Sequence, residues 1–490
     1  MTRQATDGQG HHPLELDPQT LRAWTEKVLC HLEQYVAGLP HEPMGSVGQL
    51  GLAQRVPDPA DPEPIPRTGM DMDTLLAEIF STYLEGTYNT ASGGYMGYIP
   101  GGGLLQSALA DFITAAINRY VGVHVAAPRL AAMEAQVLRW FADLMEMPPE
   151  TRGLLTTGGS LANFSAVVTA RVAKLPEDFL DGVLYVSEHV HHSITKAAHL
   201  AGLPRRAVRS LPLDSAWRLD CDALEAAVGE DRAAGRRPFM VVGSGGTTQT
   251  GAVDDLRRLA EICAAEKLWL HVDAAYGGFF QLTRRGRQVL DGIKHADSIT
   301  LDPHKGMFLP YGTGALLVRN GEDLRRAHAA SADYMPAMQA SDHPLVQDFC
   351  EYGPELSRDC RGLRVWLPLK LHGIQPFIAS LDEKLDLARH AAEGLRAIPG
   401  MEILAEPALS VIAFRLRPAG KTDGAGDDLT RRLLERVQAR DRIFMTATTL
   451  AGAYALRLCI LSYRTHAERV EEALEIIRHE AEALLSLPGE

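Results

Sequence analysis

A lysine that follows an apolar, strand-like run is the first candidate for chemistry. Lys305 lies near the end of the string Ser298 to Gly306, whose first residues, Ser-Ile-Thr-Leu, favour a buried strand. A lysine amine forms a Schiff base with a carbonyl only when it can become neutral, which requires desolvation or a cationic neighbour such as His304. A single lysine is usually a solvated surface amine, so other strings must decide between the two interpretations.

An aspartate ends a second apolar run. Leu268 to Val272 is short and apolar, as buried parallel strands are, and Asp273 follows at the carboxyl end, where open α/β sheets bind ligands. A carboxylate buried there needs a donor, and the N–H of a pyridinium ring is one that would let the ring absorb electrons from a carbanion. The small Ala275 would let such a ring lie close to the strand end. Alternatively, Asp273 caps the next helix.

A glycine-rich turn offers an anion site. Strand-like residues from Leu154 lead into Gly158, Gly159 and Ser160, and a helical pattern follows. The free N–H groups of a helix start, two glycines that admit a close approach and a hydroxyl together favour a phosphate. The turn lacks the Lys-Ser/Thr ending of a nucleotide P-loop and the chain has no G-x-G-x-x-G here. The alternative is a helix start with ordinary turn glycines.

Histidines gather at another predicted junction of strand and helix, at positions 189, 191 and 192. No carboxylate or cysteine cluster accompanies them at ligand spacing, so zinc is disfavoured and no metal is expected. A histidine stacked on an aromatic cofactor is the preferred interpretation, with His191 as the candidate.

Together these strings resemble the pyridoxal-phosphate-dependent group II amino-acid decarboxylases, the family that includes aromatic-L-amino-acid, tyrosine, glutamate and diaminobutyrate decarboxylases. The similarity extends from about Asn89 to the C-terminus. It rests on four strings in family order, which are Gly-Gly-Ser-Leu-Ala-Asn (158–163), His-His-Ser-Ile (191–194), His-Val-Asp-Ala-Ala-Tyr (271–276) and Asp-Pro-His-Lys (302–305). The resemblance implies an enzyme that binds pyridoxal 5'-phosphate and folds as a fold-type-I PLP-dependent transferase.

The resemblance also implies a role for each candidate. Lys305 would carry the cofactor, and Asp273 would pair with its ring nitrogen. His191 and Ala275 would lie on opposite faces of the ring. The remaining cofactor contacts would come from Gly158, Gly159, Ser160, Ser244 and His304. Ser244 stands where the family often has threonine and keeps the hydroxyl.

Weaker matches concern the substrate. Tyr95 and Tyr98 lie in a segment that resembles the family's substrate entrance, and Ser357 and Arg361 lie in one that resembles its arginine-bearing segment. Arg361, like Arg358, could instead be an exposed cation at a helix start. An aromatic substrate is slightly favoured. Gly94 replaces a bulky aromatic residue of several aromatic relatives, so an acidic or diamino substrate remains open.

The implied reaction is decarboxylation of an L-amino acid to the amine and carbon dioxide, through a Lys305 aldimine and a quinonoid intermediate that the paired ring stabilises. Tyr334 resembles the mobile-loop tyrosine that returns a proton in such enzymes, although it could be an ordinary exposed loop residue. The alternatives are decarboxylation-dependent oxidative deamination to an aldehyde, an aminotransferase or desulfurase on the same fold, and a catalytically silent interaction protein.

Composition agrees with a cytoplasmic enzyme. The chain has 490 residues and a net charge of -13 at a pI near 5.8, which disfavours nucleic acid as a partner. Six cysteines form no regular framework, as in a reducing compartment. No apolar run reaches membrane-spanning length, and the N-terminus lacks a signal-peptide core, so neither a membrane nor export is expected.

The chain is predicted to form three parts. Residues 1–100 form an N-terminal helical arm, which in the resembled family packs on the partner of a homodimer. Residues 101–372 alternate between helical and strand-like segments, which favours a mostly parallel sheet with flanking helices, the large cofactor-binding α/β domain. Residues 373–490 form a smaller α+β domain that begins with a long helix.

Overall fold

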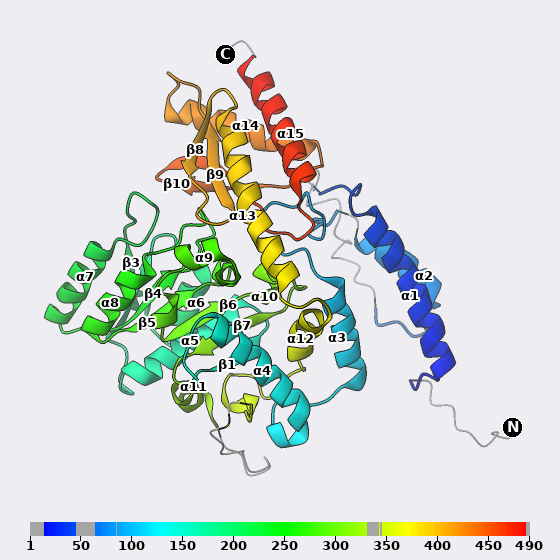
Figure 1. Ribbon diagram of the computed structural model, residues 1–490, viewed down its shortest axis with the longest axis horizontal. Helices are drawn as coiled ribbons and strands as arrows, with labels where there is room; N and C mark the ends of the chain where they lie inside the picture. The colour runs from blue at the N-terminus through cyan, green and yellow to red at the C-terminus, as the bar shows by residue number, and fades with distance from the viewer. Residues whose placement is uncertain (1–13, 46–63, 85, 331–342, 344, 487–490) are drawn as a thin grey trace, which may run out of the picture. The chain divides into compact units, whose positions relative to one another are not determined.

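The computed structural model describes residues 14–45, 64–84, 86–330, 343 and 345–486 (Figure 1). The chain divides into two compact units, Met1–Ser92 and Gly93–Glu490. The division of residues 93–490 at residue 372, and the end of the arm at residue 100, stay predictions. None of the described helices combines the length and the apolarity that crossing a bilayer requires.

The first unit contains α1 (Pro18–Gly38), α2 (Met72–Glu78) and a π-helical turn (Ile79–Tyr83). Asp17 begins α1 because its carboxylate accepts hydrogen bonds from the free N–H groups of Gln19 and Thr20. No residue of α1 is buried. The helix meets the α2 region through stacking of the His31 and Phe80 rings, whose centroids lie 5.1 Å apart. This unit therefore has little core of its own.

A seven-stranded sheet organises the second unit, in the order β1-β7-β6-β5-β4-β2-β3. Its strands are β1 (Arg152–Thr156), β2 (Gly182–Ser187), β3 (Val208–Leu211), β4 (Arg237–Ser244), β5 (Trp269–Asp273), β6 (Ser298–Leu301) and β7 (Gly314–Val318). Neighbouring strands are parallel except at β7, which runs antiparallel to both β1 and β6. The predicted, mostly parallel α/β sheet is confirmed.

Helices cover both faces of this sheet (Figure 1). The helices of this part of the chain are α3 (Leu105–Ile117), α4 (Pro128–Leu144), α5 (Gly159–Lys174), α6 (His192–Leu200), α7 (Cys221–Ala233), α8 (Leu256–Glu266), α9 (Arg284–Val289), α10 (Pro303–Gly306), α11 (Gly321–His328) and α12 (Gly362–His372). Successive strand residues point to opposite faces, so Leu184 and Val186 of β2 pack with α5 and α6, while Val183 and Tyr185 pack in the core that includes α4, α7 and α8. Burial on both faces explains why the central strands are continuously apolar.

The last part of the chain forms a four-stranded antiparallel sheet in the order β10-β11-β9-β8. The strands are β8 (Met401–Ala405), β9 (Val411–Leu416), β10 (Thr446–Leu450) and β11 (Ala453–Cys459), and the helices that accompany them are α13 (Gln375–Arg396), α14 (Asp423–Ala439) and α15 (Ala467–Leu485). Side chains of the three helices and of β9 and β11 share one apolar core. The predicted α+β character of this region is confirmed.

Three strands escaped prediction, and all three are sheet edges: β3, β8 and β10. Their side chains are mostly half-buried rather than buried, so they do not form the apolar runs that mark the central strands. Thr446 to Leu450, for example, is rich in threonine. Residues 331–342, which include Tyr334, lie outside the described residues.

Candidate active site

A cavity of about 290 Å³ lies where β4, β5 and β6 end and α5 begins. This edge of a parallel sheet is where ligands bind in open α/β folds. Every predicted cofactor contact lines the cavity, namely Gly158, Gly159, Ser160, His191, Ser244, Asp273, Ala275, His304 and Lys305. These residues come from five separate segments of the sequence, so the fold brings together what the motifs only suggested.

Lys305 lies on the short helix α10, directly after β6. Its Nζ is 2.8 Å from Asp302 Oδ2, and the Asp302 side chain is almost completely buried. Burial lowers the pKa of the Lys305 amine, but nearby anionic groups, Asp302 first and then Asp273, together offset this, so the pKa is raised above its ordinary value. The neighbour that sets the charge of Lys305 is therefore an anion, whereas the sequence interpretation looked to desolvation or to the cation His304.

Asp273 is the last residue of β5, and two groups donate to its carboxylate. The Asn163 amide donates to Oδ2 over 2.9 Å, and the backbone N–H of Ala275 donates to Oδ1 over 3.2 Å. Asp273 is buried, and these hydrogen bonds offset the cost of burying its charge. Asp273 is not the side-chain cap of a helix, which was the alternative interpretation; it instead faces the cavity.

The bonds to Asp273 extend into a buried relay. A carboxylate only accepts, so Asn163 must present its NH₂ to Asp273 and its carbonyl Oδ1 to His271 Nε2, 3.1 Å away. His271 Nε2 therefore carries the hydrogen, and Nδ1 accepts from the Ser298 hydroxyl over 2.8 Å. Burial lowers the pKa of His271 to about 4, which keeps this ring neutral.

The glycine turn forms the start of α5. Gly159 is the first helical residue, and among the described residues no side chain caps the helix, so its first N–H groups are available to an anion. A Cβ at Gly159 would lie 3.0 Å from Asp302 Oδ2 and 3.4 Å from Ala275 Cβ. A side chain at this position would therefore have to displace Asp302 slightly at this wall of the cavity.

His191 and His304 both border the cavity. His191 begins α6 and contacts the Ser193 hydroxyl through Nδ1 at 2.7 Å, and burial lowers the pKa of its ring. His304 contacts the carbonyl of Thr313 through Nδ1, also at 2.7 Å. Within the described residues no group of three His, Cys, Asp or Glu side chains could hold a metal ion.

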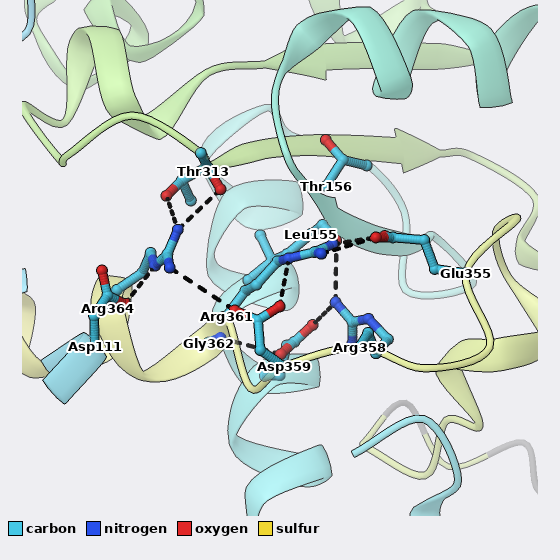
Figure 2. A network of polar contacts seen from close by, with 12 residues as sticks. Asp111, Leu155, Thr156, Thr313, Glu355, Arg358, Asp359, Arg361, Gly362 and Arg364 are labelled. Carbon is cyan, nitrogen blue, oxygen red and sulfur yellow. Dashed lines mark hydrogen bonds and ion pairs between the residues drawn. The ribbon is translucent and has the colours of Figure 1, made fainter. Parts of the chain in front are cut away.

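The predicted substrate residues do not line this cavity. Tyr95 is buried and stacks on Phe444 with 4.9 Å between ring centroids, while Tyr98 and Ser357 are exposed. Arg361 is buried and donates two hydrogen bonds to Glu355 (Figure 2). In this chain alone, these four side chains lie apart from the cofactor candidates.

The alternative that Arg358 and Arg361 are exposed cations is wrong. Arg358 is buried and pairs at 2.5 Å with Glu134, a fully buried residue of α4. Arg361 pairs with Glu355 and Asp359, and both arginines donate to the carbonyl of Leu155 on β1 (Figure 2). The carboxylates offset the cost of burying the guanidinium groups.

Sequence reasoning missed several residues of the cavity wall, which are Thr157, Leu161, Asn163, His189, Ser193, Gly246, Thr247, Thr248, Tyr276 and Asp302. Asn163 and Asp302 matter most, because they contact Asp273 and Lys305 directly. Both stand inside strings that were already singled out. A helical projection would have placed Asn163 on the same face as Gly159, four residues earlier.

These groups fit pyridoxal phosphate. The cavity offers a partly buried amine for the aldehyde, a hydrogen-bonded carboxylate for a ring nitrogen and an uncapped helix start for a phosphate. It also holds a buried carboxylate oxygen, Asp302 Oδ1, that has no partner among the described residues. A polar ligand would satisfy that oxygen.

The chain belongs to the pyridoxal-dependent decarboxylases, because the family model described as "Pyridoxal-dependent decarboxylase conserved domain" matches residues 58–417. The chain is 31% identical to an aromatic-L-amino-acid decarboxylase of Bacillus atrophaeus over 86% of its own length and 88% of the relative's. It is 27% identical to a phenylacetaldehyde synthase of Arabidopsis thaliana over 98% and 99% of the two chains.

The solved structures share the fold. The crystal structure of Oryza sativa TDC with PLP and tryptamine superposes with a TM-score of 0.90 at 24% identity, over 97% of this chain and all of that one. The protein is thus a fold-type-I, PLP-dependent amino-acid decarboxylase, a lyase. The family disfavours the aminotransferase and silent-protein alternatives.

Proposed function

We propose that this decarboxylase converts an aromatic L-amino acid to the amine and carbon dioxide, with Lys305 as the lysine that binds the cofactor. The observation that carries the proposal is the shared cavity of Lys305, Asp273 and the start of α5. The aromatic substrate is supported by the name of the relative from Bacillus atrophaeus, which matches most of both chains.

Bound pyridoxal phosphate withdraws electrons from the bond to the departing carboxylate, provided that its ring nitrogen stays protonated. We propose that Asp273 keeps that proton on the ring nitrogen. Its two donors, Asn163 and the N–H of Ala275, each take one carboxylate oxygen and so fix its orientation. Because His271 is neutral, the relay behind Asp273 brings no second positive charge that would compete for the carboxylate.

The other contacts follow from their positions around the cavity. Gly158, Gly159 and Ser160 at the start of α5, together with His304, would hold the phosphate. His191 and Ala275 would lie against the two ring faces, and Ser244 would contact the ring edge. The lowered pKa of His191 suits a neutral ring in this position.

We further propose that the chain acts as a homodimer in the cytoplasm. Helix α3 carries an apolar face whose side chains are exposed, namely Leu105, Leu109, Phe112, Ile113 and Ile117. A contiguous apolar face of this kind is typical of a protein interface, and a second copy would cover it. All six cysteines are free thiols, as expected in a reducing compartment. For such a dimer we propose four side chains, from either copy, as substrate contacts: Tyr95, Tyr98, Ser357 and Arg361.

Tyr334 remains our proposed proton donor to the carbon that has lost carbon dioxide. The second candidate function is formation of an aldehyde by oxidative deamination. It is favoured by the similarity to a phenylacetaldehyde synthase over nearly the whole of both chains. The second function also consumes oxygen and releases ammonia, so an analysis of the product and of oxygen uptake separates the two.

A panel of L-amino acids tested for carbon dioxide release identifies the substrate. We expect turnover of at least one of phenylalanine, tyrosine, tryptophan and their hydroxylated forms; release only from acidic or diamino acids would contradict the aromatic assignment. Borohydride reduction followed by peptide mapping should place the cofactor on the peptide that contains Lys305. Cofactor on the peptide of the buried Lys384 would contradict the site.

A further inference from the structure

Arg364, a residue of α12 that the sequence interpretation did not select, contacts the loop before β7 and helix α3. Its Nη1 donates to the carbonyl of Gly312 over 2.9 Å and to the hydroxyl of Thr313 over 3.0 Å (Figure 2). Its Nε donates to Asp111 of α3 over 2.7 Å. The Arg364 side chain is 13% exposed, and these hydrogen bonds hold its guanidinium on both sides.

Thr313, which Arg364 contacts, in turn contacts His304. The Thr313 carbonyl lies 2.7 Å from His304 Nδ1, and a carbonyl can only accept. Nδ1 of His304 therefore carries a hydrogen, and Nε2 is the nitrogen left to face the cavity. The ring lies beside the glycine turn, because a Cβ on Gly158 would be 3.9 Å from His304 Cε1.

The same segment packs directly on the glycine turn. Gly314 pairs with Thr156 where β7 meets β1. A Cβ on Gly314 would lie 2.6 Å from the Cα of Gly158, which leaves no space between the start of β7 and the glycine turn. A shift of Thr313 would therefore move both His304 and the start of α5.

We propose that Arg364 is a positioning residue for the phosphate end of the cofactor site, acting through Thr313 on His304 and on the turn at Gly158. This inference rests on the proposed function, which assigns the phosphate to His304 and the start of α5. Arg364 itself is not among the residues that line the cavity. Its planar group binds a carboxylate on one side and two oxygens of the loop on the other, which a lysine cannot reproduce.

The test compares pyridoxal phosphate with pyridoxal, which lacks the phosphate. Each is titrated into the cofactor-free enzyme, and the absorbance of the lysine-bound chromophore gives the dissociation constant. We expect Arg364→Gln to weaken pyridoxal phosphate about tenfold, as the loss of charged hydrogen bonds does, and to change pyridoxal by less than about twofold. Arg364→Lys should recover part of the loss.

Matched variants separate positioning from general stability. Arg257→Gln removes an arginine that binds Asp291 with two hydrogen bonds on the surface, and it should change neither constant. His304→Asn should weaken the phosphate compound, and adding Arg364→Gln to it should cost less than in the wild type, because both act on one contact. If Arg364→Gln does not fold, Thr313→Val removes one acceptor with little change in shape, and it should give a smaller loss of the same selectivity.

Equal weakening of both compounds by Arg364→Gln, or no weakening of either, would overturn the inference. Additive losses in the double variant would exclude the route through His304. If the wild type itself does not prefer the phosphate compound, or if the label is not on Lys305, the proposed function fails instead. The two failures are therefore distinguishable.

Discussion

Asn163 and Asp273 are joined by a 2.9 Å hydrogen bond between α5 and β5, and this bond decides how every group behind it is oriented. The carboxylate can only accept, so the Asn163 amide has one allowed orientation, and His271 then has one allowed tautomer. The orientation of the groups in the buried relay therefore depends on Asp273, the residue that faces the cavity.

Replacing Asn163 should therefore impair catalysis more than cofactor binding. We expect Asn163→Leu to retain the cofactor, because the phosphate and amine contacts persist, and to lower kcat at least about tenfold, because Asp273 loses a donor and its fixed orientation. The measurement is kcat alongside cofactor content. Ser165→Ala is the control, since Ser165 is another buried polar residue of α5; a similar loss in this variant would mean that any buried change in α5 impairs the enzyme.

The Asp302 carboxylate should set the pH at which Lys305 reacts. A raised pKa keeps the amine protonated, and only the neutral amine attacks an aldehyde. Asp302→Asn removes the negative charge and leaves the burial, so the pKa of Lys305 should fall. Stopped-flow capture of pyridoxal phosphate by the cofactor-free protein should then reach its half-maximal rate at a lower pH.

Asp297→Asn gives the comparison for that experiment. Asp297 is also a largely buried aspartate, but it accepts from the N–H of Leu270 at the start of β5 and does not contact Lys305. Its replacement should leave the pH profile of capture in place. An unchanged pH profile of cofactor capture in Asp302→Asn would show that the charge of Asp302 does not cause the raised pKa of Lys305.

His271 should make the fold sensitive to mild acid. Its pKa is about 4 in the folded protein and near 6.5 in the unfolded chain, so the unfolded state binds a proton first as the pH falls. Its contribution is complete above pH 6.5 and is lost progressively toward pH 4, by up to about 3 kcal/mol. Urea unfolding at pH 7 and pH 5 should show a smaller difference in His271→Gln than in the wild type, whereas His390→Gln, which changes an exposed histidine of α13, should behave as the wild type.

Tyr334 should decide which product leaves the enzyme. Tyr334→Phe should still release carbon dioxide but should divert product from amine toward aldehyde, with oxygen consumed and ammonia released. Without this proton donor, the carbon that has lost carbon dioxide is protonated more slowly and has more time to react with oxygen. Amine formed at an undiminished rate without aldehyde would make Tyr334 a bystander.

The central strands of the large sheet were predictable because burial on both faces makes each an apolar run. The edge strands β3, β8 and β10 were not, since one side of each meets solvent or a polar partner and the run is broken. The antiparallel direction of β7 could not be predicted from the sequence either. Its residues, Gly314 to Val318, are as apolar as those of a parallel strand, and periodicity carries no information on direction.

The cavity was predictable wherever a short string holds both the chemistry and its position, as at Lys305 and at the glycine turn. Contacts between distant segments were not predictable in this way. Arg361 was expected near the substrate, but Glu355 and Asp359 hold it against β1. The effect of Asp302 on Lys305 was available in the sequence, since the two are three residues apart, but only the turn of α10 shows that they touch.

The reversed strand β7 has a consequence for biosynthesis. β1 is the first strand of its sheet to leave the ribosome and β7 is the last, yet among the described strands β1 pairs with β7 alone. A nascent chain must therefore carry β1 as an unpaired edge while every other strand of that sheet is being made, and exposed edges invite association with other chains. Nascent chains stalled before Gly314 should bind chaperones at the segment around β1, and the glycine turn can take its final shape only when synthesis has passed Val318.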